Sequence, residues 1–262
     1  MSEGKIESSR DGAVGWLVFN NPQRLNAVSY EMWRSLPEKI ADVVDDPDIR
    51  VVVLRGEGDK AFISGADISQ FEKARSSEAG ITDYDDATRL ANEAILLCPK
   101  PTIAMIQGYC IGGGLGVALC CDLRFAAANA RFAIPAARLG LGYAYGGIKR
   151  LVDVVGLAFA KEIFYTARQF TADEAVAMRL INRIFPKADL LAAVNEVSGW
   201  IGQNAPLTIS AAKLAIEAAQ AEWDGKDSSA VDNAVAKCFA SEDYKEGRRA
   251  FSEKRIPDFK GA

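Results

Sequence analysis

The chain of 262 residues contains no histidine. Without an imidazole, a Ser-His-Asp triad, a Cys-His pair and a histidine metal ligand or general base are all excluded. Basic residues are not in surplus either, because 31 lysines and arginines stand against 35 acidic residues, for a net charge of −4. This balance disfavours a nucleic-acid partner, whose phosphates bind basic surfaces. Much familiar enzyme and binding chemistry is therefore removed before any motif is considered.

Long apolar runs are also missing. No segment approaches the roughly 18 apolar residues that a membrane span needs, and the first residues, MSEGKIESSRDG, lack the apolar stretch of a secretory signal. The five cysteines form no CxxC pair and lie mostly in apolar stretches, which is typical of buried free thiols in a reducing compartment. We therefore expect a cytoplasmic protein with no metal site and no membrane contact.

Short apolar runs alternate with helical patterns through the first 200 residues. Val51 to Leu54 form a β-branched run without polar alternation, which predicts a strand covered on both faces. Ser29 is expected to cap a helix whose apolar positions repeat at helical spacing. Further strands are expected at residues 16–19, 102–106, 124–126 and 132–134. This alternation predicts an α/β core with a mostly parallel sheet.

The pattern becomes purely helical after about residue 204, with segments at 208–221, 229–240 and 241–254. Three helices form too small a unit to bury much area alone. We therefore divide the chain into a core, 1–204, and a helical region, 205–262, that packs on a neighbour or a symmetry mate. The acidic, weakly periodic stretch 73–86 is expected to be a mobile flap, with an irregular helix as the alternative.

A glycine cluster, Gly108 to Gly116, follows one of the expected strands. It fails the G-x-G-x-x-G pattern, because the third glycine would fall on Val117 or Leu119, and it lacks the Lys-Ser/Thr of a phosphate-binding loop. Consecutive glycines still let the backbone approach a ligand, and the following helix presents unpaired amides. The cluster therefore indicates either an anion or oxyanion site, or a tight strand-to-helix turn with no ligand.

A second turn, Lys60 to Ile68, also leads from an apolar strand into a corner of small residues. Its amides would face the same crevice at the carboxyl ends of the strands. Two amides from separate turns, aimed at one oxygen, form an oxyanion hole.

These turns stand among motifs that together resemble the crotonase superfamily, the enoyl-CoA hydratase/isomerase family. The resemblance covers nearly the whole chain in order, through Asn21-Pro22, Asn26-Ala27, Ala61 to Ile68, Lys100-Pro101-Thr102, Gly112-Gly113-Gly114, Cys121 to Arg124, Leu139-Gly140, Thr171-Ala172 and Phe251 to Arg255. It implies a spiral of ββα units with a helical C-terminal trimerisation region. It also implies a homotrimer, or a homohexamer built as a dimer of trimers.

The family binds an acyl-CoA thioester and stabilises its enolate, a chemistry of fatty acid metabolism. By this resemblance the amides of Ala66 and Gly113 are the two oxyanion donors. Ala66, Asp67, Ile68 and Ser69 would line the pantetheine. Phe251 and Lys254 would reach CoA, from an adjoining subunit. Coenzyme A is part of the substrate, so no separate cofactor is expected.

The chain departs from its relatives at two positions. Hydratases of the family carry one glutamate in G-G-G-x-E and another in P-E-x-x-L-G, and here these positions are Gly116 and Ala136. Hydration needs one group to activate water and another to deliver a proton, each worth roughly 10² to 10⁴ in rate. Simple hydration is therefore disfavoured, as is isomerisation, which usually keeps the second glutamate.

Loss of CO2 forms an enolate without a base, so this chemistry survives the missing glutamates. The loop 139–148 resembles that of methylmalonyl-CoA decarboxylases, which have a tyrosine where Tyr143 stands. Tyr143 would orient the carboxylate or relay a proton, and Arg138 would recognise an acid group on the acyl chain. The plainer alternatives are that Tyr143 is a packing aromatic and that Arg138 forms a surface or interface ion pair.

We expect a lyase that decarboxylates a short malonyl-type acyl-CoA. The second hypothesis is hydration or isomerisation with replacement carboxylates, for which Asp67, Asp85 and Asp86 are candidates. Asp67 is expected rather to brace its turn by accepting backbone amides, and the other two to be solvated. The third hypothesis is a CoA-thioester-binding protein without catalysis.

Overall fold

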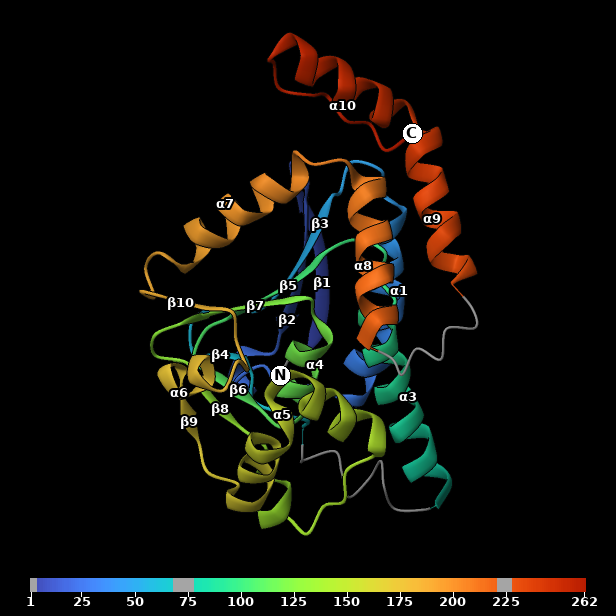
Figure 1. The fold of residues 1–262 in the computed structure, drawn as a ribbon. Coiled ribbons are helices and arrows are strands. Elements are labelled where there is room, and N and C mark those ends of the chain that lie inside the picture. Colours follow the sequence, from blue (N-terminus) through green and yellow to red (C-terminus); the bar gives the residue numbers. More distant parts are fainter. Residues whose placement is uncertain (1–3, 68–77, 221–227) are drawn as a thin grey trace.

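The computed structural model describes residues 4–67, 78–220 and 228–262. Its larger sheet has the order β1-β2-β3-β5-β7-β10 (Figure 1). The strands are β1 (Lys5–Asp11), β2 (Val14–Asn20), β3 (Val51–Gly56), β5 (Thr102–Ile106), β7 (Leu123–Ala127) and β10 (Arg183–Phe185). β1 and β2 pair antiparallel, and every other pair in this sheet is parallel. The expected mostly parallel sheet is confirmed.

A second sheet, not separated in the sequence analysis, has the order β4-β6-β8-β9. It contains β4 (Ala61–Ile63), β6 (Tyr109–Ile111), β8 (Arg131–Ala133) and β9 (Phe170–Thr171). β4, β6 and β8 are parallel, and β9 pairs antiparallel with β8. β4, β6 and β8 each follow a strand of the larger sheet, and a helix comes after each along the chain. This repeated ββα order confirms the expected fold.

Among the described residues, the core contains these helices and 3-10 turns in chain order: η1 (Pro22–Arg24), α1 (Tyr30–Asp45), α3 (Glu78–Leu96), α4 (Gly113–Cys120), η3 (Pro135–Arg138), α5 (Tyr145–Thr166), α6 (Ala172–Ala177) and α7 (Leu190–Gly202). The Ser29 hydroxyl accepts the Met32 N–H at 3.2 Å, so the predicted cap of α1 is confirmed. The apolar stripe predicted for α1 is buried at Trp33, Leu36 and Ile40.

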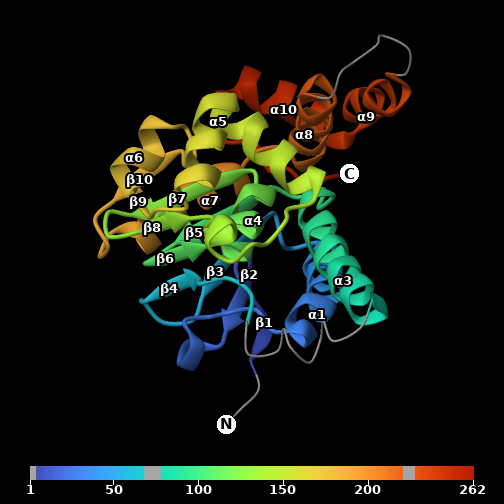
Figure 2. The same cartoon turned by 90° about the horizontal axis from the view of Figure 1, so that it is seen from below.

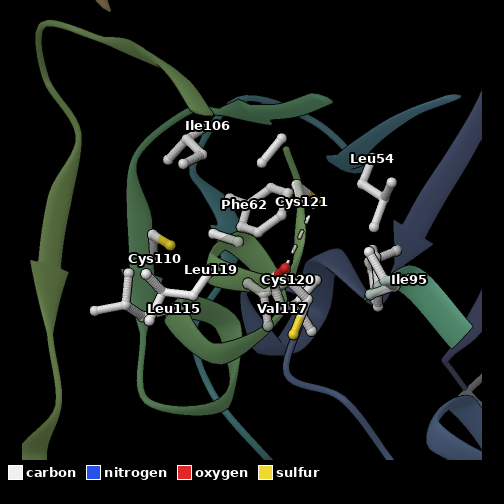
Figure 3. Packing of buried hydrophobic residues seen from close by; sticks show 14 of the residues in the cluster. Leu54, Phe62, Ile95, Ile106, Cys110, Leu115, Val117, Leu119, Cys120 and Cys121 are labelled. Atoms are coloured by element: carbon white, nitrogen blue, oxygen red, sulfur yellow. Dashed lines mark hydrogen bonds between the residues drawn. The ribbon is translucent and has the colours of Figure 1, made fainter. Parts of the chain in front are cut away.

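The two faces of the larger sheet are covered by different helices. Val51 and Val53 of β3 pack in a cluster with Leu190 and Val194 of α7. Their neighbours along the strand belong to the main core with α1, α3 and α4. Figure 3 shows part of that core, where side chains of β4, β6 and α4 gather around Phe62. β3 is therefore buried on both faces, as its unbroken apolar run predicts.

The C-terminal helices are α8 (Pro206–Gln220), α9 (Ser229–Ala240) and α10 (Glu242–Glu253). Figures 1 and 2 show α9 and α10 at the periphery of the molecule. Within one chain, α9 buries no residue fully and α8 buries only Ala211. Large apolar side chains of this region stay exposed, among them Ile216, 69%, and Phe239, 62%.

The flap expected at 73–86 is wrong for residues 78–86, because α3 begins at Glu78. Tyr84, Ala87, Ala91 and Ile95 are buried at helical spacing in the main core. This apolar stripe begins near the end of the acidic stretch and continues beyond it, so the stretch alone gave a weak helical signal. Residues 73–77 lie outside the described part of the chain.

Candidate active site

The turn after β4 is held by hydrogen bonds to the segment that precedes α1. The Ser64 N–H donates to the Leu25 carbonyl at 3.1 Å, and the Val28 N–H donates to the Gly65 carbonyl at 2.9 Å. The Asp67 N–H in turn donates to the Val28 carbonyl at 2.9 Å. Because these bonds flank Ala66 on both sides, the direction of its amide is fixed by residues 25–28.

That supporting segment is anchored by two buried asparagines. The Asn26 side chain, 1% exposed, donates to the carbonyls of Glu57 and Ala61 at 2.9 and 2.8 Å. Its Oδ1 accepts the Asn21 N–H at 3.1 Å, and the Asn21 side chain donates to the Ala27 carbonyl at 2.8 Å. Asn26 also has a left-handed φ of 58°, a conformation that asparagine tolerates better than most residues. In the sequence these asparagines stand out only as part of a family motif, and their anchoring role is visible only in the fold.

The second turn leads from β6 into α4. Gly112 has φ +55° and donates its N–H to the Ala133 carbonyl at 2.8 Å. A Cβ atom on Gly114 would lie 2.2 Å from the Ile63 carbonyl oxygen, so only glycine fits there. α4 therefore begins pressed against the end of β4.

The two turns meet at Ala66 and Gly113. A Cβ atom on Gly113 would lie 3.7 Å from the Ala66 backbone nitrogen and 3.3 Å from Cζ2 of Trp33. Gly113 is the first residue of α4, so its N–H has no acceptor within the helix. The described residues provide no acceptor for the Ala66 N–H. The fold therefore brings the two predicted oxyanion donors together beside a tryptophan wall.

Trp33 is held in turn from α3. Its Nε1 donates to the Tyr84 hydroxyl at 3.1 Å, and both side chains are buried. The ring of Tyr84 also stacks on Tyr30, with centroids 6.0 Å apart. The wall behind Gly113 is thus built from α1 and α3. Its only sequence signal was the apolar spacing of α1.

The positions where the resemblance expects glutamates flank this turn. Gly116 follows Gly113 by about one helical turn, and a Cβ atom there would meet no described residue within 4 Å. Ala136 is buried in η3, whose Pro135 lies 3.9 Å from where a Cβ atom of Gly112 would be. Neither position carries an acid or a base.

Tyr143 lies in the loop between η3 and α5. It is half-buried against the main core, with its ring edge-on to Phe164 at a centroid distance of 5.1 Å. Burial raises the pKa of its hydroxyl above the ordinary value, so the phenol keeps its proton at neutral pH. Arg138 ends η3 and is exposed, without an ion pair to any residue that the structure describes. The alternative of a surface ion pair for Arg138 is therefore not seen among those residues.

Two of the candidate replacement carboxylates are exposed, and the third forms an ion pair. Asp67 is buried, and its carboxylate accepts a hydrogen bond from the Arg24 guanidinium at 2.6 Å, an ion pair that ties its turn to η1. Asp85 and Asp86 are exposed on α3, and Asp86 pairs with Arg89 at 3.1 Å. Ile68 and Ser69 lie outside the described residues.

Phe251 and Lys254 lie at the end of α10. Phe251 is 87% exposed, and Lys254 is the exposed C-cap residue. Figure 1 shows α10 at the opposite end of the molecule from β8, β9 and α5. One chain therefore does not bring these residues to the glycine turns, and only a neighbouring subunit would do so.

Two negative findings apply to the described residues. No helix among them is both long and apolar enough to cross a membrane. No group of three or more histidine, cysteine or acidic side chains in the same residues is placed to hold a metal ion.

Comparisons with known proteins identify the family of this chain. The sequence profile of the enoyl-CoA hydratase/isomerase family matches residues 9–262. A short-chain-enoyl-CoA hydratase of Clostridium acetobutylicum is 34% identical, and the alignment covers 99% of both chains. A crotonyl-CoA hydratase of Syntrophomonas wolfei is 35% identical over 99% of both. The crystal structure of an enoyl-CoA hydratase/carnithine racemase from Magnetospirillum magneticum superposes with a TM-score of 0.93 at 36% identity, covering 98% of this chain and 96% of that one. The chain belongs to the enoyl-CoA hydratase/isomerase family, in the crotonase superfamily.

Proposed function

We propose that this enzyme binds a short malonyl-type acyl-CoA and removes its carboxylate as CO2. One observation carries the proposal: the Ala66 nitrogen lies 3.7 Å from the point where a Cβ atom would project from Gly113, while the flanking positions 116 and 136 hold no carboxylate. Such a site stabilises an enolate but offers no acid–base pair for adding water.

The thioester carbonyl oxygen would accept both amide hydrogens. As the bond between Cα and the carboxylate carbon breaks, its electron pair moves to Cα and onto that oxygen, and CO2 departs. The negative charge develops where the two donors point, and each such donor is worth about 2.7–4 kcal/mol in known acyl-transfer sites. The enolate then takes a proton at Cα to give the shortened acyl-CoA.

Tyr143 is the residue proposed to orient the substrate carboxylate and to relay the proton. Its raised pKa keeps the hydroxyl protonated, so it donates a hydrogen bond to the carboxylate and can relay a proton to Cα. Arg138, exposed in the preceding turn, would bind the substrate's acid group through its planar guanidinium. The main chain of Ala66 and Asp67, continuing through Ile68 and Ser69, would line the pantetheine.

Hydration or isomerisation is the second candidate. It is favoured by the relatives that are 34–35% identical to this chain, which are named as enoyl-CoA hydratases. It would require acid–base groups other than side chains at 116 and 136. The ion pair of Asp67 and the exposure of Asp85 and Asp86 weigh against the carboxylates first considered.

Product analysis separates these reactions. The purified protein is incubated with methylmalonyl-CoA and, separately, with crotonyl-CoA, and the products are identified by mass. Loss of 44 mass units from methylmalonyl-CoA, as CO2 departs, supports the proposal. Rapid gain of water by crotonyl-CoA that survives Tyr143→Phe would reject it. No turnover across a CoA-thioester panel, with tight CoA binding, would instead support a binding protein.

We further propose that residues 205–262 assemble the chain into a homotrimer or a dimer of trimers in the cytoplasm. The exposed apolar side chains of α8 and α9 support this, because large apolar patches mark interfaces. In such an assembly Phe251 and Lys254 would reach the CoA of an adjoining subunit. Sedimentation equilibrium tests the assembly, and a monomer at micromolar concentration would contradict it.

A further inference from the structure

Gly116 is a glycine that neither packing nor backbone geometry requires. It lies inside α4, where its N–H donates to the Gly112 carbonyl at 3.1 Å. Its φ is not positive, and a Cβ atom there would meet no atom of residues 4–67, 78–220 or 228–262 within 4 Å. Gly114, two residues earlier, is the contrast, since its Cβ would collide with the Ile63 carbonyl. A helix interior disfavours glycine relative to alanine. Gly116 therefore lowers the stability of α4, and no local contact or backbone conformation requires it.

The space at Gly116 lies on the same side of α4 as the oxyanion donor. Every residue of α4 is buried except Gly113 and Gly116. Residues three apart share a helix face, so the open face of α4 consists of these two glycines. A thioester carbonyl carbon held at Gly113 carries Cα on one side and the sulfur on the other. With the pantetheine running along Ala66 and Asp67, as proposed above, Cα and its substituents come next to the space that Gly116 leaves.

We infer that this space receives a substituent on Cα, and that the enzyme is selective for acyl-CoA thioesters with an alkyl branch at Cα. The inference rests on the proposed function for the position of the thioester, and it adds the substrate class. Gly116 acts as a specificity-determining residue, because any side chain there would occupy the volume that the branch needs.

Binding of two unreactive thioesters tests this without requiring turnover. Isobutyryl-CoA and propionyl-CoA differ by one methyl group on Cα, and their Kd values are measured by calorimetry on the full-length protein. The variants are Gly116→Leu and Gly116→Ala. Gly199→Leu is the matched control, since Gly199 is exposed on α7 with nothing within 4 Å of its Cβ position.

Wild type should bind isobutyryl-CoA at least as tightly as propionyl-CoA. Gly116→Leu should weaken the binding of isobutyryl-CoA by about tenfold or more relative to that of propionyl-CoA. This is the scale of one misplaced methyl group in a closed pocket. Gly116→Ala should change the ratio of the two Kd values in the same direction but by less. This variant keeps the test available if the leucine variant fails to fold. Gly199→Leu should leave the ratio unchanged.

The inference is overturned if the ratio stays constant in both Gly116 variants, or if wild type prefers propionyl-CoA by tenfold. Binding of neither thioester would overturn it together with the proposed site. Absence of CO2 release from methylmalonyl-CoA, with the selective binding intact, would reject decarboxylation alone.

Discussion

The backbone nitrogen of Ala66 lies 3.7 Å from the point where a Cβ atom would project from Gly113. One residue follows β4, the other begins α4, and β4 and β6 are parallel neighbours in the smaller sheet. Because adjacent parallel strands end at the same edge, the turns that leave them are brought together. This arrangement makes the backbone, rather than side chains, the main chemical feature of the site.

Gly113→Ala should lower decarboxylation sharply. The added methyl group would stand 3.7 Å from the Ala66 nitrogen and 3.3 Å from Cζ2 of Trp33, in the space proposed for the thioester oxygen. We expect a loss of about 100-fold in kcat/KM, comparable to removing one oxyanion donor. Steady-state kinetics measures it, with Gly199→Ala as control. Unchanged kinetics would place the carbonyl oxygen elsewhere.

Tyr143→Phe should slow decarboxylation by about 10² or more, if the hydroxyl orients the carboxylate or relays a proton. Stability should change by less than about 0.5 kcal/mol, because the ring contact with Phe164 is retained. Single-turnover rates and urea unfolding measure the two effects. If the variant reacts at the wild-type single-turnover rate, Tyr143 serves only as a packing aromatic.

Asn26→Ala should destabilise the protein by about 2–4 kcal/mol. The substitution removes three hydrogen bonds from a buried site and leaves the carbonyls of Glu57 and Ala61 without that donor. Urea unfolding checks the value. Gln23→Ala, an exposed substitution in the same segment, should stay within about 0.5 kcal/mol of wild type. Equal effects from both variants would contradict an anchoring role for Asn26.

Two glycines of one helix should respond in opposite ways to alanine. Gly116→Ala should raise the free energy of unfolding by about 0.5–1 kcal/mol, because the helix gains a better former and the site is open. Gly114→Ala should lower it by about 1–3 kcal/mol, because the methyl group collides with the Ile63 carbonyl. Thermal and urea unfolding give the sign of each change in the free energy of unfolding. If Gly116→Ala is destabilised, the space beside Gly116 is not open.

Stability should fall at alkaline pH. Burial raises the pKa of the thiols of Cys98, Cys110 and Cys121, and raises that of Cys120 to about 12, above an ordinary value of 9.0. Since the folded state binds these protons more tightly, its stability is complete below pH 9 and is lost as pH rises from 9 toward 12. Each thiol contributes a slope of up to about 1.4 kcal/mol per pH unit in that window. Urea unfolding at pH 7, 8.5 and 10 measures how the free energy of unfolding changes with pH. Cys120→Ala should make this change smaller. A slope that is flat from 8.5 to 10 would contradict the burial of these thiols.

The central strands β2, β3, β5 and β7 and helix α1 could be predicted because each carries a clear apolar signal, whereas the edge strands β1 and β10, one mostly exposed and the other three residues long, were missed. The run Val51 to Leu54 has no polar interruption, and Ser29 precedes an apolar stripe at helical spacing. The smaller sheet could not be separated, since β4, β6 and β8 have three residues each, too few to show a period. α3 was mistaken for a flap over residues 78–86 because its buried stripe starts near the end of the acidic stretch.

The sequence by itself determined that imidazole chemistry is absent, that the glycine turns follow strands, and that positions 116 and 136 carry no glutamate. These are properties of residue identity and order. Only the tertiary structure decided that Ala66 and Gly113 meet, that Trp33 stands behind them, and that the space at Gly116 opens on the same side. Such relations depend on strand pairing and on packing between segments far apart in the chain, which no local pattern encodes.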